Sequence, residues 1–243
     1  MAKKLKSLID LLKWAYYTSN SKNYIKYLKM GGVKIGDNCI VRYPRTARID
    51  TTRPSLITIG DNVDMNKNFQ ILTHDWGSSV FRNCYHDLVN SSGKVCIGSN
   101  IYFGTDVIVL KGVSIGDNCI IGAGAVIAKD IPANSVAAGV PCKVVCSLDE
   151  YYQKRKQIAL GEAVEYVRSI KERFGRRPLI SEMREEFIYF VDKRNIGDYP
   201  EIPIKLQLGT GYEGWLEHHK ALFESFEDFI DFALDEDKNN SLK

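Results

Sequence analysis

The sequence predicts an all-β solenoid, a parallel β-helix of six-residue repeats, with helical segments at both ends. The first observation is a run of large apolar residues at every sixth position: Ile97, Phe103, Val109, Ile115, Ile121 and Ile127. The second is that a small residue often follows each of them. A period of six fits neither a helix nor a simple strand. It fits very short strands that turn a corner every six residues around a shared core.

The same hexad recurs upstream, which indicates how far the solenoid extends. IGDNCI occurs at residues 35–40 and again at 115–120, and two close variants stand between them. Three hexads make one triangular coil of 18 residues, which is the interval between the last two repeats. The two earlier intervals are longer by 6 and by 20 residues. The sequence therefore predicts a small excursion near 42–55 and a large one near 75–94.

The chain divides into three regions by pattern and charge. Residues 1–148 carry a net charge of +8 and residues 149–243 carry −5, although the whole chain carries only +3. The charge changes where the hexads end. We therefore expect an N-terminal helical cap (1–30), a β-helical domain (31–147) and a helical C-terminal extension (148–243).

Both flanking regions are expected to be helical. In the cap, apolar residues recur at helical spacing and would cover the open end of the solenoid. The alternative is contact with a membrane interface through Trp14, Tyr16 and Tyr17, which we favour less. In the C-terminal region, Ser181 is expected to N-cap a helix over residues 181–195.

The repeat region resembles a known family, the hexapeptide-repeat acyltransferases. The resemblance rests on ITIGDN at 57–62, ILTHD at 71–75 and IGDNCIIGAGAVIAKDIPANSVAAGVPCKVV at 115–145, and it covers roughly residues 31–146. The segment is most similar to the galactoside, maltose and polysaccharide O-acetyltransferases. The resemblance implies a left-handed parallel β-helix, acetyl-CoA as the acyl donor, and a homotrimer with active sites between neighbouring subunits.

His74 is the candidate catalytic residue. Within the repeat region only His74 and His86 are histidines, and a group with a pKa of about 6.5 suits general-base catalysis at neutral pH. His74 ends a coil beside the large excursion, where the similar acetyltransferases carry their catalytic histidine. His86 is the second candidate for the base, and Asp75 or Asp87 would orient the imidazole. A purely structural role is the alternative for His74.

The resemblance also implies six contacts with coenzyme A: Gly104, Thr105, Ala123, Ala128, Lys129 and Lys143. Gly104 and Thr105 match a Gly-Ser pair near the thioester, and a backbone N–H there would stabilise the oxyanion. Ala123 matches an alanine whose backbone meets the pantetheine arm. The small residues would equally serve as corners of a solenoid.

Basic residues are expected to contact the coenzyme phosphates. Ala128 and Lys129 match a Thr-Lys pair of the family, and Lys143 matches an arginine near the phosphates. Cys146 stands where the family has a second arginine, so Lys111 or Lys129 would have to compensate.

Four residues are candidates for contact with the acceptor: Arg42, Asp75, His86 and Tyr102. Arg42 falls where the galactoside enzyme has an acceptor-binding asparagine, and Tyr102 replaces a tryptophan beside the site. These departures argue against a simple galactoside and favour an anionic or nucleotide-linked sugar. Three further arginines of the same segment either are solvated or recognise an anionic acceptor: Arg45, Arg48 and Arg53.

The predicted function is acetyl-CoA-dependent O-acetylation of a sugar hydroxyl in bacterial surface polysaccharide, by direct transfer in a ternary complex. N-acetylation of an amino sugar nucleotide and an inactive β-helical scaffold are the alternatives. A β-helical carbonic anhydrase needs three His ligands per metal, so no metal is expected. The six cysteines match neither a disulfide nor a zinc pattern, which favours the cytoplasm. No nucleic-acid partner is expected.

Overall fold

The structure is a computed structural model that describes residues 11–235. The chain divides into two compact units after Tyr152. Helix α4 (Leu148–Phe174) begins in the first unit and continues into the second. The change of region expected after residue 147 therefore coincides with the start of α4, and the boundary between the units follows a few residues later.

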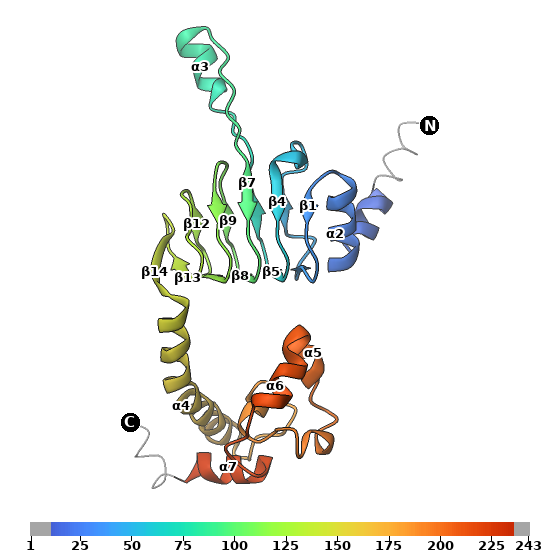
Figure 1. The fold of residues 1–243 in the computed structure, drawn as a ribbon, viewed down its shortest axis with the longest axis vertical. Coiled ribbons are helices and arrows are strands. Elements are labelled where there is room, and N and C mark those ends of the chain that lie inside the picture. Colours follow the sequence, from blue (N-terminus) through green and yellow to red (C-terminus); the bar gives the residue numbers. More distant parts are fainter. Residues whose placement is uncertain (1–10, 236–243) are drawn as a thin grey trace. The chain divides into compact units, whose positions relative to one another are not determined.

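The first unit contains three sheets, and the first twelve strands belong to the three sheets in turn (Figure 1). The first sheet contains β1 (Lys34–Ile35), β4 (Ile57–Ile59), β7 (Val95–Ile97) and β10 (Ser114–Ile115). The second contains β2 (Ile40–Val41), β5 (Val63–Met65), β8 (Ile101–Phe103), β11 (Cys119–Ile121), β13 (Ser135–Ala138) and β14 (Lys143–Ser147). The third contains β3 (Arg48–Ile49), β6 (Gln70–Ile71), β9 (Ile108–Val109) and β12 (Val126–Ile127).

Among the named strands of the described chain, all pairs are parallel except β13 with β14. The chain therefore winds as a parallel β-helix, in which each turn as far as β12 adds one strand to each sheet.

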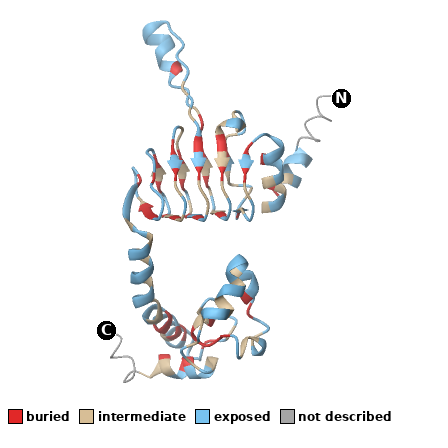
Figure 2. Cartoon of the chain, in the orientation of Figure 1, coloured by how far each residue is buried: buried red, intermediate tan, exposed pale blue. Residues whose placement is uncertain are grey.

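The hexad positions form one continuous core. The six apolar residues spaced six apart, from Ile97 to Ile127, are each at most 3% exposed. Because the coils stack in register, Ile59, Ile97 and Ile115 lie directly above one another. Figure 2 shows buried and exposed residues alternating along the strands. The predicted inward direction of every sixth residue is confirmed.

Asparagine supplies the tight corner between the first and second sheets. Five equivalent asparagines adopt left-handed backbone angles, with φ between 54° and 62°: Asn38, Asn62, Asn100, Asn118 and Asn134. Asparagine tolerates this region better than most residues. The side chains also bond to one another, since Asn100 Nδ2 donates to Asn118 Oδ1 (2.8 Å) and Asn118 Nδ2 donates to Asn134 Oδ1 (2.9 Å).

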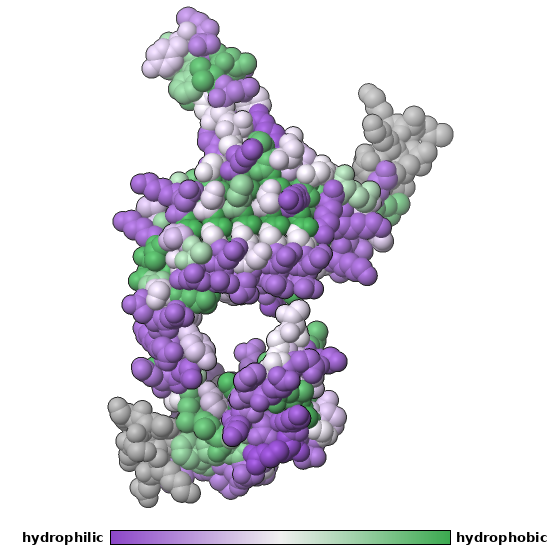
Figure 3. Space-filling view, viewed as in Figure 1, coloured by the Kyte–Doolittle hydropathy of each residue, from purple (hydrophilic) through white to green (hydrophobic). Residues whose placement is uncertain are grey.

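The outer surface of the coil is partly apolar. On the second sheet, Ile40 and Tyr102 point outward and are 44% and 42% exposed. Figure 3 shows a band of hydrophobic residues running along the coil between hydrophilic borders.

The excursions differ in form from the expectation. The extra residues of the first coil do not make one loop over 42–55, because β3 lies within that range and divides them into two short insertions. The second insertion contains the 3₁₀ turn η1 (Pro54–Leu56). The large excursion follows β6 and carries helix α3 (Ser78–Tyr85), which stands away from the coil in Figure 1.

The N-terminal helices cover the open end of the coil. Residues 11–17 are helical, and α2 (Ser21–Met30) begins after Asn20, whose side chain accepts a hydrogen bond from Asn23 N. Tyr24 and Leu28 of α2 are buried in the coil core. The hydroxyl of Ser21 accepts from Val41 N at 2.9 Å, which satisfies a donor on the edge strand β2. Residues 1–10 of the expected cap lie outside the described residues.

The second unit is helical around its own aromatic core. After α4 come η2 (Glu186–Tyr189), η3 (Ile196–Asp198), α5 (Ile204–Leu208), η4 (Gly209–Gly211), α6 (Tyr212–His218) and α7 (Phe226–Leu234). Met183, Phe190 and Phe229 are completely buried. No helix of residues 11–235 combines the length and the apolar character needed to cross a membrane.

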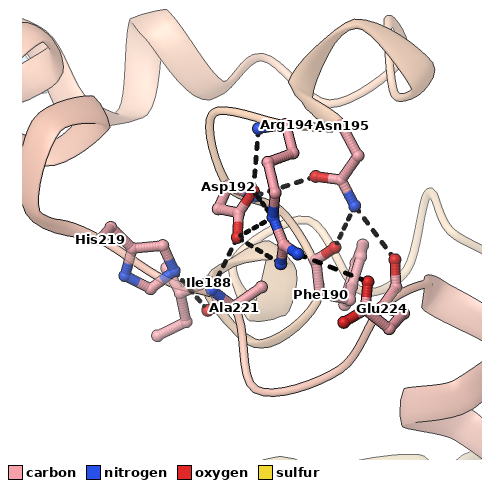
Figure 4. Close-up of polar contacts among 8 residues, drawn as sticks. All are labelled: Ile188, Phe190, Asp192, Arg194, Asn195, His219, Ala221 and Glu224. Carbon is pink, nitrogen blue, oxygen red and sulfur yellow. Dashed lines mark hydrogen bonds and ion pairs between the residues drawn. The ribbon is translucent and has the colours of Figure 1, made fainter.

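The prediction of a helix over residues 181–195 is wrong, because only the short 3₁₀ helix η2 forms there. Phe187, Tyr189, Phe190 and Val191 are all buried, and no single helix face can bury so many adjacent residues. The segment instead folds around a polar centre (Figure 4).

That polar centre is the carboxylate of Asp192, a residue only 3% exposed. It accepts hydrogen bonds from the Arg194 guanidinium (2.9 to 3.2 Å) and from Ala221 N (3.2 Å). Asn195 Nδ2 donates to Phe190 O (2.9 Å), and His219 Nε2 lies 2.7 Å from Ile188 O. These bonds join the loop after η2 to the segment before α7 (Figure 4).

Candidate active site

The candidate active site lies at the corner between the third and first sheets. His74 follows β6 by three residues and stands where the large excursion leaves the coil. The two ends of the excursion pair with each other there. His74 bridges Ser92, and Gly93 N donates to Thr73 O at 2.9 Å. This short neck fixes the backbone of His74 against the coil.

The side chain of His74 is bound to Asp50. Its Nδ1 lies 2.7 Å from Asp50 Oδ2, and the side chains of the two residues are 24% and 7% exposed. A carboxylate only accepts hydrogen bonds, so Nδ1 carries a proton, and in the neutral imidazole the lone pair is on Nε2. The imidazole is therefore held in the tautomer that a general base requires.

Two threonines complete the environment of Asp50. Thr52 donates through its N (2.9 Å) and its hydroxyl (2.6 Å), and the hydroxyl of Thr73 donates as well. Burial raises the pKa of Asp50, but the hydrogen bonds from Thr52, Thr73 and His74 outweigh it and hold the pKa well below its usual range. We therefore expect Asp50 to be ionised at neutral pH.

Asp75 points away from His74. Its carboxylate pairs with Lys111 and accepts from Gly77 N at 2.9 Å. The hydrogen bond from Lys111 is the main reason why the pKa of Asp75 falls to about 2. Asp87 forms a local bond to Leu88 N. The residue that orients His74 is thus Asp50, and neither of the two carboxylates expected from the sequence.

The sequence nevertheless contains a feature that distinguishes Asp50 from the equivalent residues of the other coils. It follows the inward-facing Ile49, and the equivalent positions in the next coils hold Leu72, Leu110 and Ala128. An acidic residue therefore stands where the other coils are apolar or small. The contact between the Asp50 side chain and His74 arises from the stacking of one coil on the next. The two residues are far apart in the sequence, so the sequence alone does not indicate this contact.

Three of the expected coenzyme contacts lie at a different corner, between the second and third sheets. Gly104 and Thr105 follow β8, and Ala123 follows β11 one coil further on. The two coils touch closely, because a Cβ on Gly104 would lie only 2.5 Å from Ala123 N. This close stacking requires glycine at position 104.

The backbone donors at this corner are not equivalent. Gly104 N is occupied by Ile121 O (2.8 Å). Thr105 N and Ala123 N have no hydrogen-bond partner among the described residues. Of the two donors expected for the oxyanion, only that of Thr105 is available, and Ala123 provides a second donor beside it.

His74 and this corner are far apart within one chain. The third-sheet strands run from the Thr105 corner to the His74 corner, and five residues separate Thr105 from Leu110. At about 3.3 Å per residue, the two sets of groups lie on the order of 15–20 Å apart. A single chain therefore does not bring the histidine and these coenzyme contacts together.

The remaining basic candidates have different surroundings. Lys111 is engaged by Asp75 and Ser91 at the neck of the excursion. Ala128 and Lys129 follow β12 at the His74 corner, one coil beyond Lys111. Lys143 is exposed on β14. Unlike Lys111, neither Lys129 nor Lys143 forms an ion pair within residues 11–235.

Of the four acceptor candidates only Asp75 adjoins His74, and the other three lie elsewhere. Arg42 forms a two-pronged bond to Asp64 (2.5 to 3.1 Å) on the outer face of the second sheet. Tyr102 lies next to Asp64 in the register of that sheet. His86 is exposed at the end of α3, far along the excursion from His74. Within residues 11–235, no group of His, Cys, Asp and Glu is arranged to hold a metal ion.

Comparison with known proteins agrees with this architecture. Residues 97–129 match the family model described as bacterial transferase hexapeptide (six repeats). Galactoside O-acetyltransferase of Escherichia coli (strain K12) is 34% identical over 158 residues, which cover 60% of this chain and 72% of the relative. Protein CapG of Staphylococcus aureus is 31% identical over 127 residues, 51% of this chain and 70% of the relative.

Among solved structures, a galactoside acetyltransferase in complex with coenzyme A is 26% identical. That match covers 58% of this chain and 80% of the other, with a TM-score of 0.40. The hexad coil and the sequence matches define an acyl-transferring enzyme. The chain belongs to the hexapeptide-repeat acetyltransferase family, in which the Escherichia coli galactoside enzyme is its relative.

Proposed function

We propose that this enzyme transfers the acetyl group of acetyl-CoA to a hydroxyl of a sugar, with His74 as the general base. The observation that carries the proposal is the contact between His74 Nδ1 and the buried Asp50 carboxylate. In the neutral imidazole this contact assigns the lone pair to Nε2, and the His74 side chain is 24% exposed. A histidine held in this way is suited to accept a proton from an acceptor hydroxyl.

The reaction is a direct transfer. Nε2 of His74 takes the hydroxyl proton as the oxygen attacks the thioester carbonyl, and the resulting oxyanion accepts hydrogen bonds from Thr105 N and Ala123 N. The tetrahedral intermediate collapses with cleavage of the C–S bond, and the imidazolium returns its proton to the departing thiolate of coenzyme A. Asp50 stabilises the imidazolium throughout. No acyl-enzyme is needed.

The active site is assembled from two subunits of a homotrimer in this proposal. The separation of the His74 corner from the Thr105 corner supports it, because a neighbouring coil can supply the missing corner. The exposed apolar residues on the coil, including Ile40 and Tyr102, support subunit contact as well. We also propose that the coil is left-handed, as the family resemblance implies.

The coenzyme phosphates are assigned to Lys129 and Lys143. Cys146 stands where the family has a second arginine. Lys111 does not replace that arginine in this proposal, because its ammonium group already pairs with Asp75 and Ser91. The small side chains of Gly104 and Ala128 allow the coenzyme to lie close to the backbone of the coil. Residues 31–147 thus carry all the acyl-transfer chemistry.

The proposed acceptor is a sugar of bacterial surface polysaccharide. Acetylation before export fits a cytoplasmic location, and the free state of all six cysteines supports a reducing compartment. N-acetylation of an amino sugar nucleotide would use the same base and is kept as the alternative acceptor chemistry.

The test measures thiol release from acetyl-CoA over a panel of sugars, nucleotide sugars and amino sugar nucleotides. We expect release that depends on the acceptor and falls about 10²- to 10⁴-fold in His74→Ala. His218→Ala, in the second unit, is the matched control and is expected to behave as wild type. Full activity in His74→Ala, with loss in His86→Ala, would move the base to His86. No release with any acceptor would support the scaffold alternative.

A further inference from the structure

A second pocket lies against the first coil, between the N-terminal helices and β3. It encloses about 470 Å³, a volume within the range of small-ligand sites. Its described lining comes from residues 13–27 on one side and residues 44–51 on the other. None of the coenzyme contacts considered above lines it.

Three cations line this pocket: Lys13, Arg45 and Arg48. No described acidic side chain lines it, and none of the three cations forms an ion pair within residues 11–235. By contrast, Arg42 of the same segment is neutralised by Asp64. Unneutralised arginines beside a cavity are suited to carboxylate or phosphate, whose oxygens match the guanidinium fork.

Aromatic rings form the other part of the lining. Trp14, Tyr17, Tyr24 and Tyr27 all face the pocket. The rings of Tyr17 and Tyr27 are 5.1 Å apart, and those of Tyr24 and Tyr27 are 6.3 Å apart. Tyr24 is buried, and its hydroxyl donates to Ala47 O at 3.4 Å. These rings offer the flat apolar surface against which the C–H face of a sugar ring packs, with hydroxyls at its edge.

The pocket is connected to the candidate active site through one short segment. Ile49 and Thr51 line the pocket, and Asp50 between them holds His74. The backbone of residues 49–51 is therefore shared by the two sites. A chain of linked sugars occupying the pocket would have its neighbouring residues near the His74 corner.

We propose that this pocket binds an anionic sugar unit of the acceptor, one that carries a carboxylate or a phosphate. The cations select the charge and the aromatic rings hold the sugar ring. The inference rests on the proposed acetyl transfer to a sugar and names the class of that sugar. In this proposal the preference for an anionic acceptor comes from Arg45 and Arg48, and not from Arg42.

Two measurements test the proposal. The first compares kcat/KM for a glucuronate-containing oligosaccharide, for its neutral glucose counterpart and for a UDP-sugar. We expect the anionic oligosaccharide or the UDP-sugar to exceed the neutral one by at least about tenfold, as charge-assisted hydrogen bonds allow. In Arg45→Gln/Arg48→Gln we expect this ratio to fall toward one. Arg184→Gln, an exposed arginine of the second unit, is the matched control.

The relative rates of the two anionic acceptors identify the source of the charge. A preference for the oligosaccharide assigns the pocket to a sugar carboxylate, and a preference for the UDP-sugar assigns it to phosphate. Equal rates with charged and neutral acceptors in the wild type would overturn the proposal. An unchanged ratio in the double variant would do the same.

The second measurement is calorimetric binding of the preferred anionic acceptor to His74→Ala in the presence of coenzyme A. We expect wild-type affinity in His74→Ala and at least about tenfold weaker binding when Arg45 and Arg48 are also replaced. Binding that depends on these arginines without any thiol release in the wild type would sink the acetyl-transfer proposal and leave the pocket. Release that depends on His74 but not on the arginines would sink only the pocket.

Discussion

Asp50 and His74 are 24 residues apart in the sequence, and their side chains meet at 2.7 Å. The contact arises because one coil of the solenoid returns the chain to nearly the same place. Asp50 N bonds to Ile71 O in the next strand of the third sheet, so Asp50 lies directly beside the start of the His74 corner. The insertion after β3 supplies Thr52, which completes the hydrogen bonds of the carboxylate.

Replacing Asp50 with asparagine tests this relationship. An amide presents N–H groups as well as an oxygen, and it can turn its donor toward Nδ1 and so favour the wrong tautomer of His74. We expect kcat to fall by at least about tenfold, up to the 10²- to 10⁴-fold lost with the base itself, while KM for acetyl-CoA changes little. Steady-state thiol release at saturating acceptor gives both constants.

Two further variants separate positioning from a general loss of structure. Asp50→Glu keeps the charge and is expected to restore part of kcat. Asp37→Asn changes an exposed carboxylate at another corner and is expected to leave kcat within about twofold, since surface substitutions away from a site have small effects. An Asp50→Asn enzyme with wild-type kcat would show that His74 does not need this partner.

The coil was predictable from sequence because its physics is local and repeated. Each hexad places one apolar residue inward, and each coil places one asparagine at the corner between the first and second sheets, so Ile97 and Asn100 carry the same information as Ile115 and Asn118. The partner of His74 was not predictable in this way. The identity of this partner depends on how an irregular insertion stacks on the neighbouring coil. Asp75, which is adjacent to His74 in the sequence, was the more obvious candidate.

The second unit shows a different limit. Ser181 made a helix over residues 181–195 plausible, but in the structure Asp192 lies in a loop, where its carboxylate accepts hydrogen bonds from Arg194 and Ala221. Helix propensities of ordinary residues differ by at most about 0.7 kcal/mol per residue, and tertiary contacts such as those of Asp192 override them. Such tertiary contacts leave no periodic trace in the sequence.

The asparagine ladder is expected to stabilise the coil. Asn118 adopts φ of 59° and bonds to both of its neighbours in the ladder. Alanine pays about 1–2 kcal/mol for left-handed angles and also loses the side-chain bonds, so we expect Asn118→Ala to lose about 2 kcal/mol of stability. Asn118→Gly accepts the backbone angle and is expected to lose less. Denaturant unfolding followed by far-ultraviolet circular dichroism ranks the three proteins, and an alanine variant at least as stable as the glycine variant would contradict the argument.

Acid is expected to destabilise the second unit through Asp192. The hydrogen bonds from Arg194 hold the pKa of Asp192 well below its usual range. A carboxylate with a lowered folded-state pKa contributes stability that is fully present above its unfolded-state pKa of about 3.9, and that contribution is lost as pH falls through the folded-state value. We therefore expect the unfolding temperature of the second unit to decrease once the pH is lower than about 4.

The Asp192→Asn variant shows whether Asp192 is responsible. It lacks the titrating group, so its unfolding temperature at pH 7 is expected to be lower than wild type and the loss on acidification smaller. Asp198→Asn, in η3, provides the comparison, with wild-type behaviour expected. Calorimetry at pH 7, 5 and 3.5 gives the values, and an Asp192→Asn profile parallel to wild type would rule out this origin.

Lys143 is expected to bind the coenzyme and to take no part in the chemistry. Its side chain is exposed on β14, and an exposed cation near a phosphate contributes about 1 kcal/mol or less, screened by salt. We expect Lys143→Ala to raise KM for acetyl-CoA about two- to fivefold at low salt, with kcat unchanged. The difference is expected to shrink at 0.5 M NaCl, where the Debye length is only about 4 Å. Lys34→Ala, an exposed lysine on β1, removes the same charge elsewhere on the coil, so an equal rise in KM in that variant would mean that net charge, and not a contact at Lys143, attracts the coenzyme.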